Sequence, residues 1–230
     1  MARSKVYDFI SATFSYPDSA LVDLLGKRLL DTENSLDILE YRSSSEALQV
    51  LALTILSSSP ERLEAEYVQT FGHSISRECP PYEAEYGQAD LSQKMHTLSD
   101  IAGFYKAFGL GLSPKLKDRM DHVSVELDFM HFLCFKEYYA LHQGHPELKL
   151  TLCKDAQTKF LGDHMGRWVF RFVERLEKKA SANIYGPVGR CLKEFLESDM
   201  RTIGLEPGRV VCLDFVGLPD EEMPGTESVM

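Results

Sequence analysis

The sequence predicts an all-α protein built as one domain. Apolar residues recur at the three- and four-residue spacing of amphipathic helices, and strand-like alternation does not appear before residue 205. Turn and capping residues divide this pattern into pieces of helix length, without a low-complexity linker between two halves. We therefore assign residues 1–204 to one helical domain. Residues 205–230 end in an acidic, proline-bearing stretch and are expected to form an extended or partly disordered tail, in which 210–216 could be a short strand.

Local signals set the first helix boundaries. Residues 2–15 carry one apolar face, Pro17 ends that helix, and Asp18 can cap the next one. The motif Ser43-Ser-Ser-Glu46 predicts a capping box that opens a third helix. A fourth helix is predicted over 59–72, because proline suits a first helical turn and glycine suits the position after the last one.

Residues 73–89 interrupt the helical pattern. The run Cys79-Pro80-Pro81-Tyr82-Glu83 cannot be helical throughout, because each proline lacks an N–H and restricts the residue before it. The segment also holds acids and tyrosines, which suit contacts to a cationic and apolar partner. Long ordered loops are often functional, so we expect either a binding edge or a packed crossover here.

The second half of the chain predicts longer helices. Asp90 can cap a segment that ends near Gly109, and residues 115–142 are apolar on nearly every side, as expected of a central helix. Two further apolar stripes begin at Leu161 and Ile184 and predict the last two helices.

Composition excludes several classes of function. The net charge of −10 leaves no basic stripe for nucleic acid and disfavours stable association with anionic membranes, whereas a basic peptide is electrostatically favoured. The N-terminus lacks the apolar core of a secretory signal, and the stretch from Val50 to Leu56 is too short to span a bilayer. We expect a cytoplasmic protein.

Catalytic and cofactor motifs are not found in the sequence. The five cysteines form no CxxC pair, and the phosphate-binding glycine patterns and GxSxG are missing. A di-iron bundle needs two Glu-x-x-His motifs, and only Asp128-x-x-His131 comes close. Cys79 has no evident base to activate it. We expect no enzyme activity, no metal site and no bound cofactor.

The sharpest local feature is Asp121-His122-x-x-x-Glu126. His122 and Glu126 stand one helical turn apart and are predicted to pair on an otherwise apolar helix face. A buried polar group without a partner costs about 1–3 kcal/mol, so this pair needs an internal or an external partner. It is either a core histidine that anchors a loop or the polar floor of a groove.

Four blocks together resemble the TorD/DmsD/NarJ family of redox-enzyme maturation chaperones. The first three are Glu66-Tyr-Val-Gln-Thr-Phe71-Gly, Pro80-Pro-Tyr-Glu83 and Asp121-His-Val-x-x-Glu126-Leu-x-Phe-Met130. The fourth runs from Phe160 through His164, Trp168 and Phe172 to Ile184-Tyr185. Each block alone is weak, but their order and spacing are specific.

The resemblance implies a TorD-like bundle of roughly ten helices. It implies a chaperone that binds the N-terminal leader and apo form of a molybdenum-cofactor oxidoreductase, assists cofactor insertion and delays export by the twin-arginine route. The chaperone would be a monomer or a homodimer. The residues assigned to peptide binding are Phe71, Pro81, Tyr82, Glu83, Tyr86, Asp121, His122 and Glu126. Tyr82 departs from the tryptophan found in some members.

These residues predict an apolar groove, fringed by carboxylates, between the 73–89 loop and the start of the 115–142 helix. Buried leader side chains would set the affinity, while Glu83, Glu85, Asp121 and Glu126 would set orientation and association rate. Two alternatives stay open: an assembly subunit retained in a redox enzyme complex, and a small helical metal-dependent enzyme.

Overall fold

The computed structural model describes residues 1–72, 78–87, 90–111 and 118–207, and these ranges are helical with no strand beyond one isolated bridge. The predicted all-α class is confirmed, and the nine α-helices in the described ranges are close to the expected ten. The helices are α1 Ala2–Thr13, α2 Ser19–Leu39, α3 Arg42–Leu56, α4 Pro60–Phe71, α5 Leu91–Ala107, α6 Val123–His142, α7 Glu147–Phe160, α8 Gly166–Lys179 and α9 Tyr185–Thr202. Two short elements are a 3₁₀ turn, η1 (Glu83–Glu85), and a π-helical turn, η2 (Leu161–Met165).

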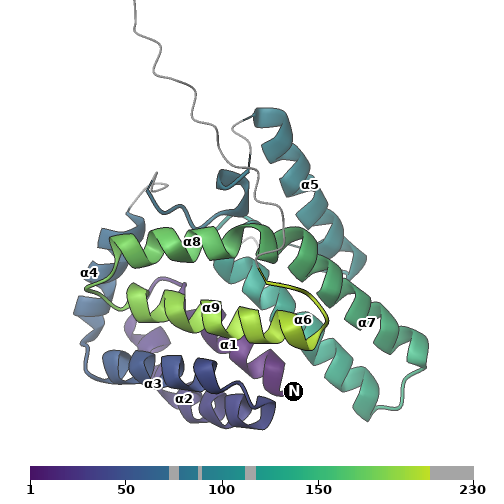
Figure 1. Ribbon diagram of the computed structural model, residues 1–230, viewed down its shortest axis with the longest axis horizontal. Coiled ribbons are helices and arrows are strands. Elements are labelled where there is room, and N and C mark those ends of the chain that lie inside the picture. The colour runs from purple at the N-terminus through teal and green to yellow at the C-terminus, as the bar shows by residue number, and fades with distance from the viewer. Residues whose placement is uncertain (73–77, 88–89, 112–117, 208–230) are drawn as a thin grey trace, which may run out of the picture.

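The helices pack around one continuous core. α1 lies against both α2 and α6, and α9 lies against α3 on one side and α8 on the other (Figure 1). The apolar stripes predicted for α8 and α9 all face inward, and Trp168, Phe172 and Phe195 are among the largest fully buried side chains. Burial of these stripes is what holds the bundle together.

A buried carboxylate links helices from the beginning and the end of the helical domain. Asp199 on α9 is fully buried and accepts hydrogen bonds from Arg3 Nη2 at 2.8 Å and from the Tyr7 hydroxyl at 2.7 Å. The hydroxyl of Tyr41 lies 3.3 Å from the same carboxylate. Because a buried charge needs partners, this contact joins α1, α9 and the start of α3.

The predicted cap at Asp18 is confirmed, and so are the predicted ends of α4. The side chain of Asp18 accepts from the Leu21 N–H at 2.8 Å, and the Ser59 hydroxyl accepts from the Arg62 N–H at 3.3 Å. Gly72 follows α4 with φ +73°, a conformation that glycine adopts without strain. Asp90 is the N-cap residue of α5, although its side chain makes no capping bond.

The capping box predicted at residues 43–46 is wrong. α3 begins at Arg42, and the N-cap Tyr41 makes no side-chain capping bond. Instead its hydroxyl donates to Thr202 Oγ1 at 2.8 Å, and the preceding Glu40 adopts a left-handed φ of +59°. A tertiary contact to α9 therefore decides where α3 starts, in place of the local motif.

One helix boundary and one whole helix also differ from the prediction. Residues 118–122 form a turn, so α6 begins at Val123 and not near residue 115. α7 was not predicted, because its buried side is a narrow strip of Cys153, Ala156, Gln157 and Phe160. The tail beyond residue 207, including the possible strand at 210–216, lies outside the described residues.

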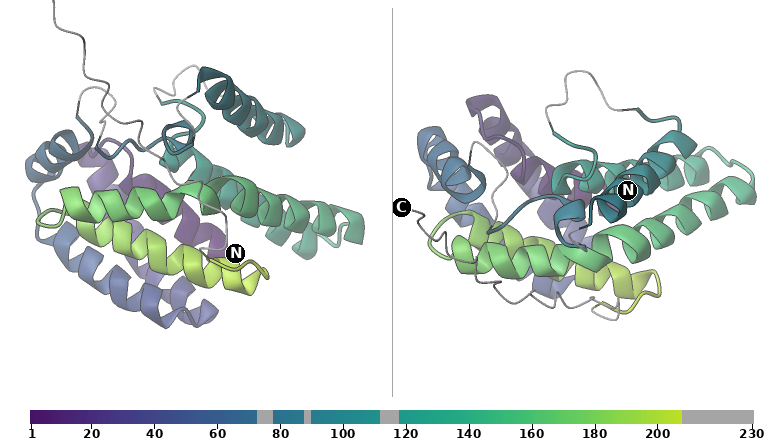
Figure 2. Two further views of the ribbon diagram at one scale, coloured as in Figure 1. Left: turned by 45° about the horizontal axis from the view of Figure 1, so that its top comes forward. Right: turned by 90° about the horizontal axis from the view of Figure 1, so that it is seen from above.

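α5 and the far end of the α6–α7 hairpin stand away from the main stack of helices (Figures 1 and 2). Leu91 and Met95 at the start of α5 are 73% and 61% exposed, whereas Ile101 and Tyr105 near its other end are buried. Only the C-terminal part of α5 thus joins the core. None of the helices in the described ranges combines the length and the apolar character needed to cross a bilayer.

Replacing Asp199 with alanine is expected to lower the free energy of unfolding by about 3–5 kcal/mol, because the largely buried Arg3 guanidinium would lose its closest counter-charge and keep only Glu137 at 3.8 Å. Urea titration followed by circular dichroism measures this. The matched control is Glu197→Ala on the same helix, whose carboxylate pairs with Arg201 at the surface. Its effect should stay below about 1 kcal/mol, and equal losses in the two variants would contradict the anchoring role of Asp199.

Candidate functional site

The proline-rich loop is pinned to the start of α6 by a short backbone pairing. The Glu83 N–H donates to the Asp121 carbonyl at 3.0 Å, and the Val123 N–H donates to the Pro81 carbonyl at 2.9 Å. These two bonds flank an isolated antiparallel bridge between Tyr82 and His122. We call the paired segments 81–85 and 119–123 the clamp. It brings together two blocks that lie almost forty residues apart in sequence.

Charged side chains reinforce the clamp. Asp121 is fully buried and accepts two hydrogen bonds from Arg119, at 3.0 and 2.7 Å, and a third from the Ala84 N–H at 3.1 Å. Arg119 also pairs with Glu85 at 3.2 Å and lies 4.6 Å from the centroid of the Tyr82 ring. The guanidinium therefore links both segments of the clamp and orients the tyrosine.

His122 caps α6. Its Nδ1 accepts from the Ser124 N–H at 3.2 Å and lies 2.7 Å from the Ser124 hydroxyl. Burial lowers the pKa of His122, so the imidazole is neutral, as a hydrogen-bond acceptor at a helix N-terminus must be. The predicted pairing with Glu126 is wrong, because His122 lies outside the helix as its N-cap and Glu126 faces α8.

Glu126 is a carboxyl group held in the core in its protonated form. It is fully buried, its Oε2 accepts from Trp168 Nε1 at 3.0 Å, and burial together with the nearby charge of Glu83 raises its pKa well above the ordinary value. Glu83 in turn lies 3.1 Å from His164 Nδ1, and His164 Nε2 lies 3.5 Å from Asp100. A polar cluster thus runs from α6 through the clamp to α8 and α5.

The π-helical turn η2 places His164 in this cluster. A π turn inserts an extra residue into a helix and is frequent at functional sites. Gly166 permits the backbone of η2 to pack closely against it, since a Cβ at position 166 would lie 2.6 Å from the Leu161 carbonyl oxygen. His164 and Trp168 belong to the fourth sequence block, but only the structure shows that they contact Glu83 and Glu126.

Most of the predicted binding residues are buried by other parts of the chain. Phe71 packs edge-on against Tyr185, with ring centroids 4.8 Å apart. The other buried members are Pro81, Glu83, Asp121, His122 and Glu126. Only Tyr82 and Tyr86 are partly exposed. Within the described residues, the side chains that were expected to line an open groove contact one another instead. They therefore support the neighbouring surface from beneath and do not themselves form a binding surface.

An aromatic surface that the sequence did not predict lies beside the clamp. Tyr16 follows α1 and is 49% exposed, and its ring lies 5.3 Å from that of the half-buried Tyr67 on α4. Burial raises the pKa of Tyr67 to about 12 and also raises that of Tyr82, and the Asp118 carboxylate adds to both shifts. Asp118 therefore lies near both rings. We call Tyr16, Tyr67, Tyr82 and Asp118 the tyrosine face.

The sequence carries no specific signal for this face, because Tyr67 stands among ordinary apolar positions of α4 and Tyr16 lies in the connection after α1. Phe71 lies beneath the face, with its ring 5.1 Å from that of Tyr67.

The described residues contain no group of three or more side chains placed to hold a metal ion. Burial raises the pKa of the Cys79, Cys134 and Cys191 thiols to about 12, so these thiols are protonated at neutral pH. Their chemistry is that of small core residues, and thiolates would be needed for nucleophilic attack or metal binding.

Residues 40–174 match the family described as nitrate reductase delta subunit, and the chain belongs to that family. This confirms the resemblance to TorD/DmsD/NarJ proteins. The clamp and η2 lie within the matched range, whereas Tyr16 precedes it.

Individual relatives are named as assembly chaperones. The chain is 29% identical to the selenate reductase assembly chaperone protein of Thauera selenatis over 63% of this chain and 72% of that one. It is 26% identical to the perchlorate reductase assembly chaperone protein of Dechloromonas aromatica over 90% and 92%. It is 25% identical to the chaperone protein TorD of Vibrio cholerae over 60% of each chain.

A solved structure shares the fold. The putative redox enzyme maturation protein from Archaeoglobus fulgidus superposes with a TM-score of 0.52 at 22% identity, covering 84% of this chain and 93% of that one. At this identity the likeness concerns the fold alone.

Replacing Glu126 with glutamine tests whether the buried Glu126 side chain holds a proton in the folded protein. The unfolded chain releases this proton near the ordinary pKa of 4.5, while the folded chain retains it to higher pH. The contribution of Glu126 to the free energy of unfolding of the wild type therefore falls as the pH rises above about 5. The glutamine variant has no such proton and does not show this fall. We expect the variant to gain at least about 1 kcal/mol relative to wild type between about pH 5 and about pH 8.

Urea titrations across that pH range measure the difference. Glu174→Gln, at an exposed position on α8, is the control and should show no such trend. A constant difference between Glu126→Gln and wild type at every pH would contradict the raised pKa.

Proposed function

We propose that this chain is a cytoplasmic chaperone that binds the N-terminal leader and the apo form of a molybdenum-cofactor oxidoreductase. The observation that carries the proposal is the tyrosine face: partly exposed aromatic rings beside a carboxylate, positioned by the clamp that unites the family's sequence blocks. Membership of the family and the assembly-chaperone names of its relatives support it.

The chemistry of the face suits a leader that combines basic and apolar residues. Each leader leucine or phenylalanine that is fully buried contributes about 1.5–3 kcal/mol. An exposed pair between Asp118 and a leader arginine contributes only about 0.2–1 kcal/mol. Apolar contacts with the tyrosines therefore set the affinity, and the carboxylate speeds association and orients the leader.

The buried residues of the predicted site contribute to binding by holding other side chains in position. Arg119 and Asp121 fix the backbone on both sides of the Tyr82–His122 bridge, and Arg119 packs on the Tyr82 ring. Because Tyr82 is held in place before the leader binds, less conformational entropy is lost on binding. Asp121 and His122 thus matter for binding without touching the leader.

A chaperone of this kind needs no catalytic group. By occupying the leader it would delay export until the cofactor is inserted, and it would then dissociate. An assembly subunit that is retained would instead co-purify with the mature, cofactor-loaded enzyme in equal amounts. Recovery of this chain with the apo-enzyme alone distinguishes the chaperone from the retained subunit.

Removing the exposed rings is expected to weaken leader binding. The double change Tyr16→Ala and Tyr82→Ala should raise the Kd for the leader peptide of a molybdenum-cofactor oxidoreductase by about tenfold to a hundredfold. Isothermal titration calorimetry with the synthetic leader measures it. Phe135→Ala removes a 39% exposed ring on α6, outside the tyrosine face, and should leave the Kd unchanged. Equal Kd values for wild type and the double variant, with unchanged circular dichroism, would exclude the face as the leader site.

Neutralising Asp118 is expected to slow association. Asp118→Asn should reduce the association rate of the leader about twofold to fivefold at low salt, with little change in the dissociation rate. Added salt should remove the difference, because exposed charges are screened. Stopped-flow fluorescence measures both rates, and Asp155→Asn on the exposed side of α7 is the control of equal charge. A change confined to the dissociation rate would assign Asp118 a packing role instead.

A further inference from the structure

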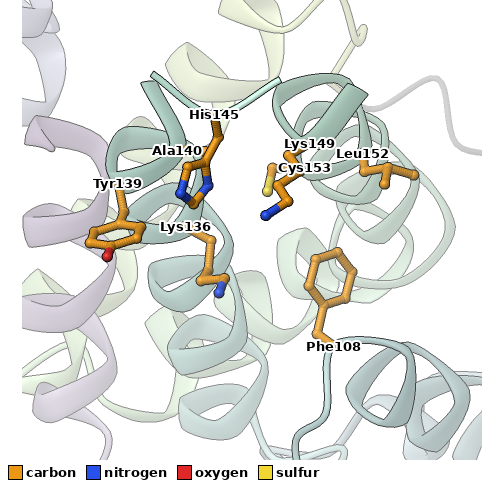
Figure 3. A pocket seen from close by; sticks show the side chains of 8 residues that line it. All are labelled: Phe108, Lys136, Tyr139, Ala140, His145, Lys149, Leu152 and Cys153. Carbon is orange, nitrogen blue, oxygen red and sulfur yellow. The ribbon is translucent and has the colours of Figure 1, made fainter. Parts of the chain in front are cut away.

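A pocket of about 210 Å³ opens where the end of α5 meets the α6–α7 hairpin (Figure 3). Its residues belong neither to the clamp nor to the tyrosine face. Much of the lining is apolar: Phe108 follows α5, and Leu152 and Cys153 come from α7. The volume equals that of about seven liquid waters and is smaller than pockets for drug-sized ligands. It suits one ring or a short aliphatic chain.

Three nitrogen-bearing side chains point into this pocket. Figure 3 shows Lys136 of α6, His145 of the connecting turn and Lys149 of α7 converging on the same hollow. Carboxylates are missing from the lining, and within the residues that the structure describes neither lysine forms an ion pair. The chain as a whole has a net charge of −10. The lining thus offers cationic groups without a carboxylate among them, and ammonium groups form charge-assisted hydrogen bonds with anions.

We propose that this pocket binds a small organic anion, in which a carboxylate is attached to an apolar ring or short apolar chain. The ammonium groups of Lys136 and Lys149 and an N–H of His145 bind the carboxylate, and Phe108 and Leu152 cover the apolar body. An inorganic anion would leave the apolar lining unfilled. A neutral ligand would make no charge-assisted contact with the ammonium groups.

The carboxylate has two possible sources. It belongs either to a free aryl or alkyl carboxylate or to the C-terminus of a polypeptide that ends in an apolar residue. Benzoate represents the first source, and the peptide acetyl-Gly-Gly-Phe with a free carboxylate represents the second. The tighter of the two ligands identifies the source.

Titration of the full chain with each ligand, followed by two-dimensional NMR, tests the proposal. We expect saturable shifts of the His145 and Leu152 signals with a Kd on the order of 1 mM. Benzamide, which has the ring without the charge, should bind about tenfold more weakly. The affinity for the carboxylate should fall as salt is added.

A charge-matched pair of variants separates the pocket from the general surface. Lys136→Gln with Lys149→Gln should weaken binding of the carboxylate about tenfold and leave that of benzamide unchanged. Lys159→Gln with Lys178→Gln changes the net charge equally at exposed positions outside the pocket and should have no effect. Failure of both carboxylates to saturate these signals, equal binding of benzoate and benzamide, or equal losses in the two double variants would each overturn the proposal. None of these outcomes concerns leader binding at the tyrosine face.

Discussion

The backbone pairing between residues 81–83 and 121–123 is the constraint on which the site depends. The segment around Pro80 and Pro81 cannot satisfy its own polar groups in a helix, and a buried backbone N–H or carbonyl without a partner is costly. Here those groups pair with the turn before α6. The same turn ends in the His122 cap, so one short contact both seats the loop and starts the central helix.

Carboxyl groups are concentrated behind this pairing, and each is stabilised differently. Asp121 is surrounded in the core by Arg119 and the Ala84 N–H, which satisfy its carboxylate oxygens. Glu126 avoids the cost of a second buried charge by keeping its proton. The position of Tyr82 thus rests on a polar network, so residues that never meet a partner can still control how well it binds.

The two proposed binding surfaces differ in the charge they select. The tyrosine face presents aromatic rings beside Asp118 and suits a cationic, apolar segment. The pocket of the α6–α7 hairpin presents lysines over an apolar lining and suits an anion. The two surfaces share no residue, so a ligand on one does not directly cover the other.

Sequence patterns alone determined the all-α class, the cap at Asp18, the two ends of α4 and the inward stripes of α8 and α9. These features depend on backbone donors and on helical periodicity, which act over a few residues. Tertiary structure decided the start of α3, the cap role of His122 and the burial of Glu126 against Trp168. It also assembled Tyr16, Tyr67 and Tyr82 into one face. Such contacts join residues tens of positions apart, and periodicity cannot show which helix each side chain will meet or which side chains remain at the surface.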